Sequence, residues 1–525
     1  MNSVLQSVKI VALASTLFII PGIASAQSRV IHPEAHDSSK PLRDIPPIAV
    51  VVDQNKEHPV KPVPHASKGG QDVALQTQPS VTAATVAPGL DFNGVGLSSG
   101  YSISGEPPDT NGSAGTTQYV QWVNTSFAVY SKATGTQVYP ANGTFAAGNT
   151  IWSGFAGGRC STDNSGDPIV LFDKQAQRWI FTQFAVSKSP YYQCVAVSQT
   201  ADATGAYNRY AYSFGTNFND YPKVGVWTDG YYFTFNLFAR GKRFAGADIC
   251  AMDSATARAG GAAKMVCYQT STAYGGLLPA DIDGASGAAG TTALPPAGTP
   301  EYVAGFGSNA LNVWRVTPNY SAGTISVTGP TSLPTSAFSE ACGGGACIAQ
   351  PSTTQQLDSL ADRLMYRLSY RKFGTYASLL VNHSVTAGSA TGVRWYELRD
   401  SGSGPAVYQQ GTYAPDSNYR WMGSAAQDKL GNIAVGYSVS SSSVRPTIAF
   451  ATRAPSDGAG LLSGEQTVLA GTGSQSGHTR WGDYSSISVD PTDDCTMWFT
   501  TEYLNTSGDF IWSTHVRSFK LGTCQ

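Results

Sequence analysis

The chain has 525 residues, of which only 13% are charged, and its formal net charge is −2 at pH 7. A charge this small gives no general attraction to nucleic acid or to anionic lipid, so we exclude both as partners. Beyond the N-terminal segment, no apolar run is long enough to cross a bilayer. Any ligand must therefore be recognised locally, at a particular site.

Residues 1–26 are predicted to be a secretory signal peptide. Lys9 supplies a positive start, residues 10–20 form a short apolar core, and Ala24-Ser25-Ala26 is a small-residue cleavage site. Removal of this segment takes away Lys9 and no acidic residue, which leaves a net charge of −3. We expect the mature chain to be exported to the periplasm or the extracellular space.

Residues 27–87 are polar, rich in proline and poor in aromatic side chains. Such a composition cannot bury a hydrophobic core, so a flexible leader or linker is predicted. The segment holds four of the seven histidines, and a metal-binding tail is the alternative to a plain linker.

Residues 88–525 have a different character, with more glycine, aromatic and β-branched residues. Short runs such as RWIFTQFAV (178–186) and TMWFTTEY (496–503) alternate between turn-forming segments. Alternation with a period of two, and no long run with helical spacing, predicts an all-β domain.

The runs also repeat along the domain. A polar, acidic start is followed by a first strand, a turn and an aromatic-rich second strand, and successive starts are 53 to 77 residues apart. Repeats of this length are typical of four-stranded propeller blades, so we predict a single seven-bladed β-propeller over 88–525, with six and eight blades as alternatives. The repeat starts are Asp109, Asp167, Asp220, Asp281, Asp358, Gly423 and Asp483.

All eight cysteines lie in the mature chain, and an even number in an exported protein predicts disulfides. No CxxC spacing supports a zinc site instead. Eight cysteines allow 105 connectivities, and the pairing of sequence neighbours is the one we favour. It joins Cys160 to Cys194, Cys250 to Cys267, Cys342 to Cys347, and Cys495 to Cys524.

Repeated carboxylates are the first candidates for catalysis. In a propeller the repeated position of every blade converges on the mouth of the central channel, and glycoside chemistry needs one carboxyl group as acid and one as base or nucleophile. Asp167 and Asp483 are candidates, together with Glu340 in a glycine-rich loop tied by the expected Cys342–Cys347 disulfide. The alternative is structural, because aspartate before a strand often caps backbone N–H groups.

Two Arg-Trp pairs break the symmetry of the repeat. Arg420-Trp421 and Arg480-Trp481 stand at matching places in two adjacent units, and Arg363 lies in a third. Arginines that converge on a channel can bind an anionic group through two hydrogen bonds, and aromatic rings suit sugar stacking. Packing of arginine on tryptophan between blades is the structural alternative.

Loops that combine aspartate, asparagine and glycine occur in three units. Their side-chain and carbonyl oxygens suit calcium, although none follows the EF-hand spacing. The candidate ligands are Asp109, Asp163, Asp281 and Asp283. No organic cofactor is expected, since a dinucleotide fingerprint needs a strand-to-helix context that an all-β domain lacks.

Segments such as GDPIVLFDKQAQRWIFTQFA (166–185) and RWGDYSSISVDPTDDCTMWFTTEY (480–503) resemble a group of exported bacterial β-propeller proteins. The resemblance runs through most of 88–525 and implies the fold and export, but no catalytic residue. More distantly, the layout is similar to the sialidase-like propellers, whose Asp-box is approached by TSGDFIW (506–512). The arginine-bearing F/Y-R-I-P start of that family is absent.

These observations favour an exported, monomeric propeller that acts on an extracellular polysaccharide or glycoconjugate, by hydrolysis or elimination, at the channel mouth. The alternative is a secreted binding or adhesion propeller that recognises a glycan or a cell-surface protein. The fold hosts both roles. A pocket bearing two carboxylates favours hydrolysis, whereas a channel plugged by side chains favours binding.

Overall fold

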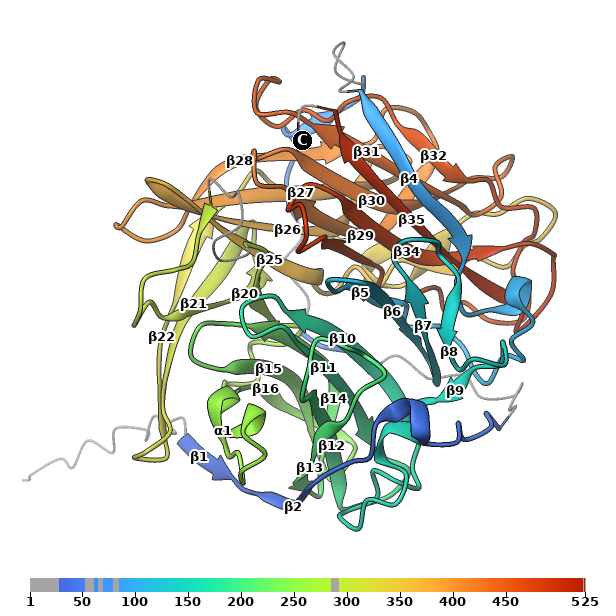
Figure 1. The fold of residues 1–525 in the computed structure, drawn as a ribbon. Coiled ribbons are helices and arrows are strands. Elements are labelled where there is room, and N and C mark those ends of the chain that lie inside the picture. Colours follow the sequence, from blue (N-terminus) through green and yellow to red (C-terminus); the bar gives the residue numbers. More distant parts are fainter. Residues whose placement is uncertain are drawn as a thin grey trace, which may run out of the picture.

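The computed structural model describes residues 28–51, 61–64, 69–78, 85–284, 292–522 and 524. The predicted signal peptide lies outside these residues. Antiparallel sheets stand around a common centre and follow one another round the ring in chain order, from β5 to β35 (Figure 1). The prediction of an all-β propeller is confirmed.

The first three units follow one another without interruption. Each begins with an inner strand, and the next strands pair outward in sequence order. The first contains β5 (Asn111–Ala114), β6 (Gln118–Val123), β7 (Ser126–Ser131), β8 (Gln137–Tyr139) and β9 (Ala146–Ala147). The second contains β10 (Gly166–Asp173), β11 (Arg178–Ala185), β12 (Tyr191–Ser198) and β13 (Tyr207–Gly215). The third contains β14 (Asn217–Val226), β15 (Tyr231–Ala239), β16 (Arg243–Met252) and β17 (Met265–Gln269).

The fourth and fifth units form one continuous sheet, because their inner strands β18 and β25 pair in parallel. The separation into seven blades therefore stays a prediction. The fourth unit contains β18 (Leu278–Ile282), β20 (Glu301–Gly307), β21 (Ala310–Asn319) and β22 (Thr324–Pro334). The fifth contains β25 (Met365–Phe373), β26 (Tyr376–Ala387), β27 (Ala390–Asp400) and β28 (Ala406–Tyr413), and β19 (Thr292–Ala293) pairs with β25.

The last two units complete the ring. The sixth contains β29 (Tyr419–Gln427), β30 (Ile433–Ser440), β31 (Thr447–Arg453) and β32 (Gln466–Leu469). The seventh contains β33 (Ser486–Val489), β34 (Met497–Leu504) and β35 (Trp512–Leu521). Its outer strand is β4 (Val86–Asn93), which comes from the N-terminal side and pairs with β35. Both ends of the domain therefore contribute to one sheet, which holds the ring closed.

Segments before the domain also pair with the ring. β1 (Ser28–Ile31) adds to β17, β2 (Pro33–Ser38) adds to β13, and β3 (Leu75–Gln76) runs parallel to β28. The composition of 27–87 did not predict these pairings. Their backbone groups supply hydrogen bonds to edge strands that are otherwise open.

Short helices and one small hairpin occupy the connections. They are η1 (Leu42–Asp44), η2 (Leu97–Ser99), η3 (Gly148–Trp152), α1 (Ser254–Arg258), η4 (Ala341–Gly344), β23 (Ala346–Ile348) and β24 (Leu357–Asp358). Within the described residues, none of the helices is both long and apolar enough to pass through a membrane.

Strands near the centre are buried on both faces, because each sheet packs against its two neighbours. All eight residues of β10, β30 and β34 are buried. Aromatic side chains fill the space between sheets; the ring centroids of Trp122 in the first unit and Phe181 in the second lie 5.3 Å apart. Burial of such rings contributes the largest favourable free energy in a core of this kind.

The four disulfides join the sequence neighbours as predicted, so that connectivity is confirmed. They link Cys160 to Cys194, Cys250 to Cys267, Cys342 to Cys347, and Cys495 to Cys524. Bonds of this type persist in oxidising compartments, which agrees with an exported protein.

Candidate functional site

A residue with a left-handed backbone marks the entry to the inner strand in six units of the described chain. Strands β10, β14 and β29 shift register at this point, as a β-bulge does. The recurring position predicted from the sequence exists, but Tyr221 and Leu360 hold it in place of Asp220 and Asp358. The six residues, with φ between 44° and 58°, are Asp109, Asp167, Tyr221, Leu360, Met422 and Asp483.

Three aspartates hold this position in adjacent units. Asp109, Asp167 and Asp483 belong to the first, second and seventh units, and strand β5 contacts both β10 and β33. All three side chains are buried, with residue exposures of 2%, 8% and 7%. Asp109 Oδ1 has no hydrogen-bond partner among the described atoms. The repeat therefore concentrates carboxyl groups on one side of the central channel.

Lys223 and two tyrosines fill the channel beside these acids. The Lys223 ammonium lies 3.4 Å from the ring centroid of Tyr221 and 3.9 Å from that of Tyr484. The backbone N–H of Tyr221 donates to Asp167 Oδ2 at 3.2 Å, and the Tyr484 hydroxyl donates to the Pro168 carbonyl at 3.1 Å. The aromatic faces stabilise the buried ammonium, which is fully enclosed.

Two of the arginines predicted to bind substrate join this cluster, but protein carboxylates already neutralise them. Arg480 Nε donates to Asp483 Oδ1 at 3.1 Å, and Nη2 pairs with the other oxygen. Arg363 donates to both oxygens of Asp362, at 2.7 and 3.0 Å, and its guanidinium lies 4.5 Å from the Tyr221 centroid. Neither arginine is left free to bind an anion.

Burial dominates the pKa values of the cluster. It raises the pKa of Asp109 well above its usual range, and repulsion from Asp483 and Asp167 adds to the shift. Burial and the neighbouring Asp220 carboxylate raise the pKa of Asp167 to about 7. Burial also lowers the pKa of Lys223 to about 8, against the attraction of the acids. At neutral pH the cluster holds protons that the same side chains would release in water.

The Asp167→Asn variant is expected to reduce the pH dependence of stability. Because the folded state raises the pKa of Asp167 to about 7, the folded chain binds the proton more tightly than the unfolded chain does. The free energy of unfolding therefore falls as pH rises from about 4 to about 7. Asp220 shares the titration, so we expect the variant to remove a loss on the order of 2 kcal/mol over this range. Urea denaturation at about pH 4.5 and about pH 7.5 measures this loss; an equal loss in both proteins contradicts the assignment.

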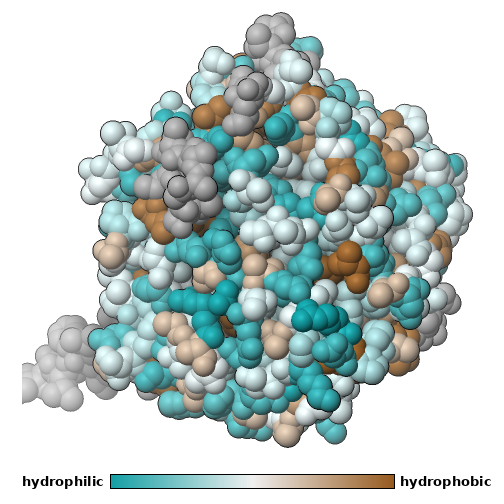
Figure 2. Space-filling model, in the orientation of Figure 1, coloured by the Kyte–Doolittle hydropathy of each residue, from teal (hydrophilic) through white to brown (hydrophobic). Residues whose placement is uncertain are grey.

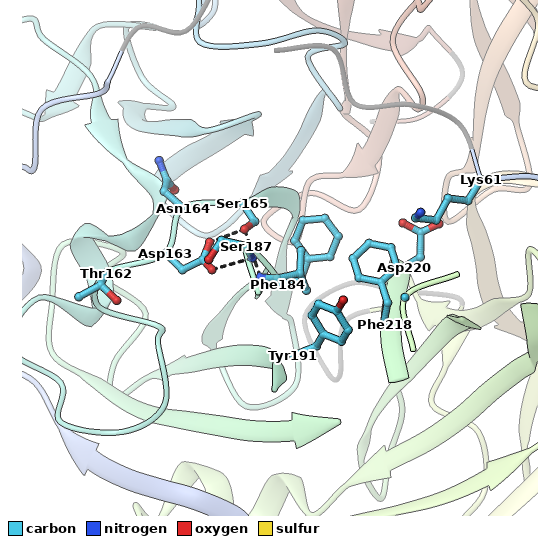
Figure 3. Close-up of a pocket in the computed structure, with 12 residues that line it drawn as sticks. Lys61, Thr162, Asp163, Asn164, Ser165, Phe184, Ser187, Tyr191, Phe218 and Asp220 are labelled. Atoms are coloured by element: carbon cyan, nitrogen blue, oxygen red, sulfur yellow. Dashed lines mark hydrogen bonds between the residues drawn. The ribbon is translucent and has the colours of Figure 1, made fainter. Parts of the chain in front are cut away.

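A cavity of about 630 Å³ opens between the second and third units (Figure 3). Asp220 and Lys61 lie at one side, and Asp163 lies at the other. Aromatic side chains stand between them: the Phe218 ring centroid is 5.9 Å from that of Phe184 and 5.4 Å from that of Tyr191. The cavity thus offers two carboxylates from different units across an aromatic surface.

The two carboxylates have different surroundings. Asp220 is half-buried; burial raises its pKa to about 6, although the charges of Arg363 and Lys61 oppose the shift. Asp163 is 6% exposed, its Oδ2 accepts the backbone N–H of Ser187 at 2.9 Å, and its Oδ1 accepts the Ser165 hydroxyl. Asp220 is therefore suited to carry a proton near pH 6, whereas two hydrogen bonds fix the position of the Asp163 carboxyl group.

The other predicted substrate-binding residues lie in packed surroundings. Arg420 donates to Glu465 and to Asp416, each at 2.7 Å. Trp421 and Trp481 are at most 1% exposed, and their ring centroids lie 5.7 Å apart. The two matching positions do meet in space, but through a Trp–Trp contact that offers no ring face to a sugar.

Glu340 precedes η4 and lies two residues before the loop that the Cys342–Cys347 disulfide closes. Its backbone forms an isolated bridge with Val385 and its carbonyl accepts the Thr386 hydroxyl at 3.0 Å. The backbone of Glu340 thus fixes the loop against β26, and its role as a catalytic acid stays a prediction.

The four predicted calcium ligands do not share a site. Asp281 and Asp283 pair with the buried Arg367, at 2.9 and 2.5 Å, whereas Asp109 belongs to the channel cluster and Asp163 to the cavity. Two groups of three acidic, histidine or cysteine residues are found among the described residues, and within each group the ligand atoms lie within 4.8 Å of one another. Neither group contains any of the four predicted calcium ligands. Calcium binding stays a prediction.

Several residues of the site were not predicted from the sequence. Phe218 and Tyr191 come from different units, and their side chains meet only because the two units pack side by side in the propeller. Lys61 belongs to the segment predicted to be a flexible leader. Lys223, in YPKVGV, carried the one usable signal, because a lysine between apolar residues of a central strand needs a partner.

No family model matches this sequence, and no curated protein is similar to it. Among solved structures, an ulvan lyase of a polysaccharide lyase family is 12% identical and aligns over 84% of this chain and 97% of its own, with a TM-score of 0.33. An endo-arabinase from Bacteroides thetaiotaomicron is 13% identical over 54% of this chain and 92% of its own, with a TM-score of 0.26. A subtype N10 neuraminidase-like protein of A/little yellow-shouldered bat/Guatemala/060/2010 is 11% identical over 58% of this chain and 96% of its own, with a TM-score of 0.22. Scores this low carry no conclusion about activity.

Proposed function

We propose that the chain hydrolyses glycosidic bonds of an extracellular glycan in the cavity between the second and third units. The observation that carries this proposal is the pair of carboxylates, Asp220 and Asp163, at opposite sides of a 630 Å³ cavity with aromatic rings between them. A cavity of this size accommodates a few sugar rings, and aromatic faces suit their apolar C–H surfaces. Paired carboxyl groups on either side of a bond are the arrangement that glycoside hydrolysis requires.

The surroundings of the two carboxyl groups assign their roles. Asp220, whose pKa is about 6, gives its proton to the glycosidic oxygen as the C–O bond breaks. Asp163, held by Ser187 and Ser165, accepts a proton from the water that attacks the anomeric carbon. One water is consumed and two shorter glycans leave. Elimination is less well supported, since the buried Lys223 is fully enclosed and cannot reach a substrate proton.

The deeper cluster then acts on Asp220 rather than on the substrate. Asp167 is 8% exposed and its titration is linked to that of Asp220. Asp483, held by Arg480, contributes to the raised pKa of Asp220. We therefore assign both residues, predicted as catalytic from the sequence, to positioning and to control of the proton on Asp220.

The test is a screen of the purified chain against neutral, acidic and basic polysaccharides. New reducing ends without an unsaturated-sugar absorbance are the expected result for at least one glycan. Unsaturated products would replace hydrolysis by elimination. Retention of a glycan with no cleavage of any would overturn the proposal.

A non-catalytic glycan-binding propeller is the second candidate, and the filled channel favours it. Tyr366, Tyr484, Lys223 and Arg367 are each at most 1% exposed and occupy the centre of the ring. The face seen in Figure 2 is mainly hydrophilic to neutral, with hydrophobic residues in small separate spots. Such a face suits a polar ligand better than an apolar protein interface.

A further inference from the structure

One cation from the N-terminal segment occupies the side of the cavity nearest Asp220. The Lys61 ammonium lies 5.1 Å from the ring centroid of Phe218 and 5.5 Å from that of Phe238. Figure 3 shows the end of this side chain beside the Asp220 carboxylate. Two aromatic faces and a carboxylate form a suitable environment for an ammonium group, since the rings attract a cation and the carboxylate balances its charge.

The backbone around Lys61 is held against the ring. The Lys61 carbonyl accepts a hydrogen bond from Arg363 Nη2 at 3.4 Å. Val63 is 4% exposed, and a Cβ at Gly275 would lie only 2.9 Å from the Val63 Cβ. The close approach at Gly275 leaves space for this segment, so Lys61 reaches the cavity as part of a packed contact.

The charge of the cavity depends on this one side chain. Among the described residues, the charged side chains of its lining are Asp163, Asp220 and Lys61, which gives a formal charge of −1, and Arg159 lies 3.7 Å from Asp163 outside the lining. With Lys61 removed, the lining would carry −2 at a pH at which Asp220 is ionised, next to aromatic rings that attract cations. An anionic or neutral sugar gains nothing from that arrangement, whereas a protonated amine replaces the contacts that Lys61 makes.

We propose that the Phe218, Phe238 and Asp220 side of the cavity is a subsite for the protonated amino group of a sugar, and that Lys61 fills it when no substrate is bound. The inference rests on the proposed function and names its substrate class: a glycan that carries free amino groups. Lys61 is tethered to the ring, so it competes at an effective concentration in the millimolar range. The substrate must displace it, and the N-terminal segment thereby restrains the site.

The test compares the binding of a glucosamine tetrasaccharide with that of its fully N-acetylated counterpart by isothermal titration calorimetry. The full-length wild type is compared with the Lys61→Met and Lys61→Met/Phe218→Leu variants. We expect Lys61→Met to bind the free amine about tenfold more tightly than the wild type does, because the tethered competitor is gone. The N-acetylated ligand should bind equally to both, and Phe218→Leu should reverse most of the gain. Lys372→Met, whose ammonium contacts the Phe373 and Gly374 carbonyls, is the matched control and should change nothing.

Equal affinity of Lys61→Met for the amine and for its N-acetylated form overturns the amino-sugar subsite. Cleavage of a neutral glycan that depends on Asp220, without any preference for the amine, overturns it as well and leaves the proposed hydrolase intact. Amine binding that Lys61→Met strengthens and Phe218→Leu weakens, without cleavage of any glycan, supports the subsite and overturns the hydrolase.

Discussion

Replacement of Asp220 by asparagine is expected to lower the turnover of the glycan substrate by about 10²- to 10⁴-fold, the contribution typical of a general acid. The amide has almost the same shape but no acidic proton to give to the leaving oxygen. For a neutral glycan KM should change little, because Asp220→Asn keeps the side chain at the wall of the cavity; a glycan with free amino groups loses the carboxylate that balances its charge, so its KM should rise. The measurement is the release of reducing ends under steady-state conditions, with circular dichroism to show that the variant folds.

The pH profile gives the same assignment an independent check. The pKa of Asp220 is about 6, and the protonated form is the one that acts, so turnover should fall as pH rises through about 6. The positive charge of Lys61 holds this pKa down, so Lys61→Met should move the fall to higher pH. Asp202→Asn, at a part-exposed carboxylate that pairs with Arg43 at 2.8 Å, is the matched control. Turnover of Asp220→Asn within threefold of the control would remove Asp220 from the chemistry.

Replacement of Arg367 by methionine is expected to lower the free energy of unfolding by about 3–5 kcal/mol, the loss typical when one partner of a buried ion pair is removed. Arg367 is 1% exposed; its Nε donates to Asp281 at 2.9 Å, its Nη2 lies 2.5 Å from Asp283, and its Nη1 donates to the Ile487 carbonyl at 3.0 Å. It therefore ties together the inner strands of the fourth, fifth and seventh units. Methionine fills a similar volume but leaves two buried carboxylates short of a partner.

The acidity of Asp283 shows how strongly these charges depend on one another. Burial alone would raise its pKa, yet Arg367, Lys174 and Arg371 together lower it to about 2.

Urea denaturation measures the free energy of unfolding that Arg367→Met loses, and the slope of the transition checks for two-state behaviour. The matched control is Arg315→Met, because the Arg315 side chain is 41% exposed and pairs with Asp400 at 3.0 Å; such a pair is worth about 0–1 kcal/mol. Equal losses for the two variants would contradict a structural role for the channel network.

Most of the fold could be predicted from the repeated sequence pattern. Alternating runs such as β11 and β34 predict strands because each side of a strand meets a different neighbour, and the repeated acidic start predicts the order of the units. Strands β1 and β2 could not be found this way. Their residues are polar and alternately exposed, and what they add is backbone hydrogen bonding to β17 and β13, which depends on the partner and not on side-chain pattern.

The site was predictable only in part. Asp167 and Asp483 do lie together in the buried cluster, and each holds the left-handed backbone conformation at the entry to its inner strand. Asp220 has a different position, since Tyr221 holds the left-handed conformation there. The residues that line the cavity come from two units and from the N-terminal segment, and contacts such as that of Lys61 with Phe218 depend on the closed ring. A sequence repeat shows only the residues that the units have in common, whereas the residues that line this cavity are not repeated from unit to unit.

Ring closure by β4 sets an order in time for the synthesis of the chain. Asn93 and His515 are partners in this last sheet although 422 residues separate them. At ordinary rates of translation, β4 emerges about 20 to 80 s before its partner exists. Throughout that interval its backbone is an open edge that other chains can join. The first strand of the ring to be synthesised, β4, is thus the last to find its partner. The risk of misassembly is concentrated in its eight residues.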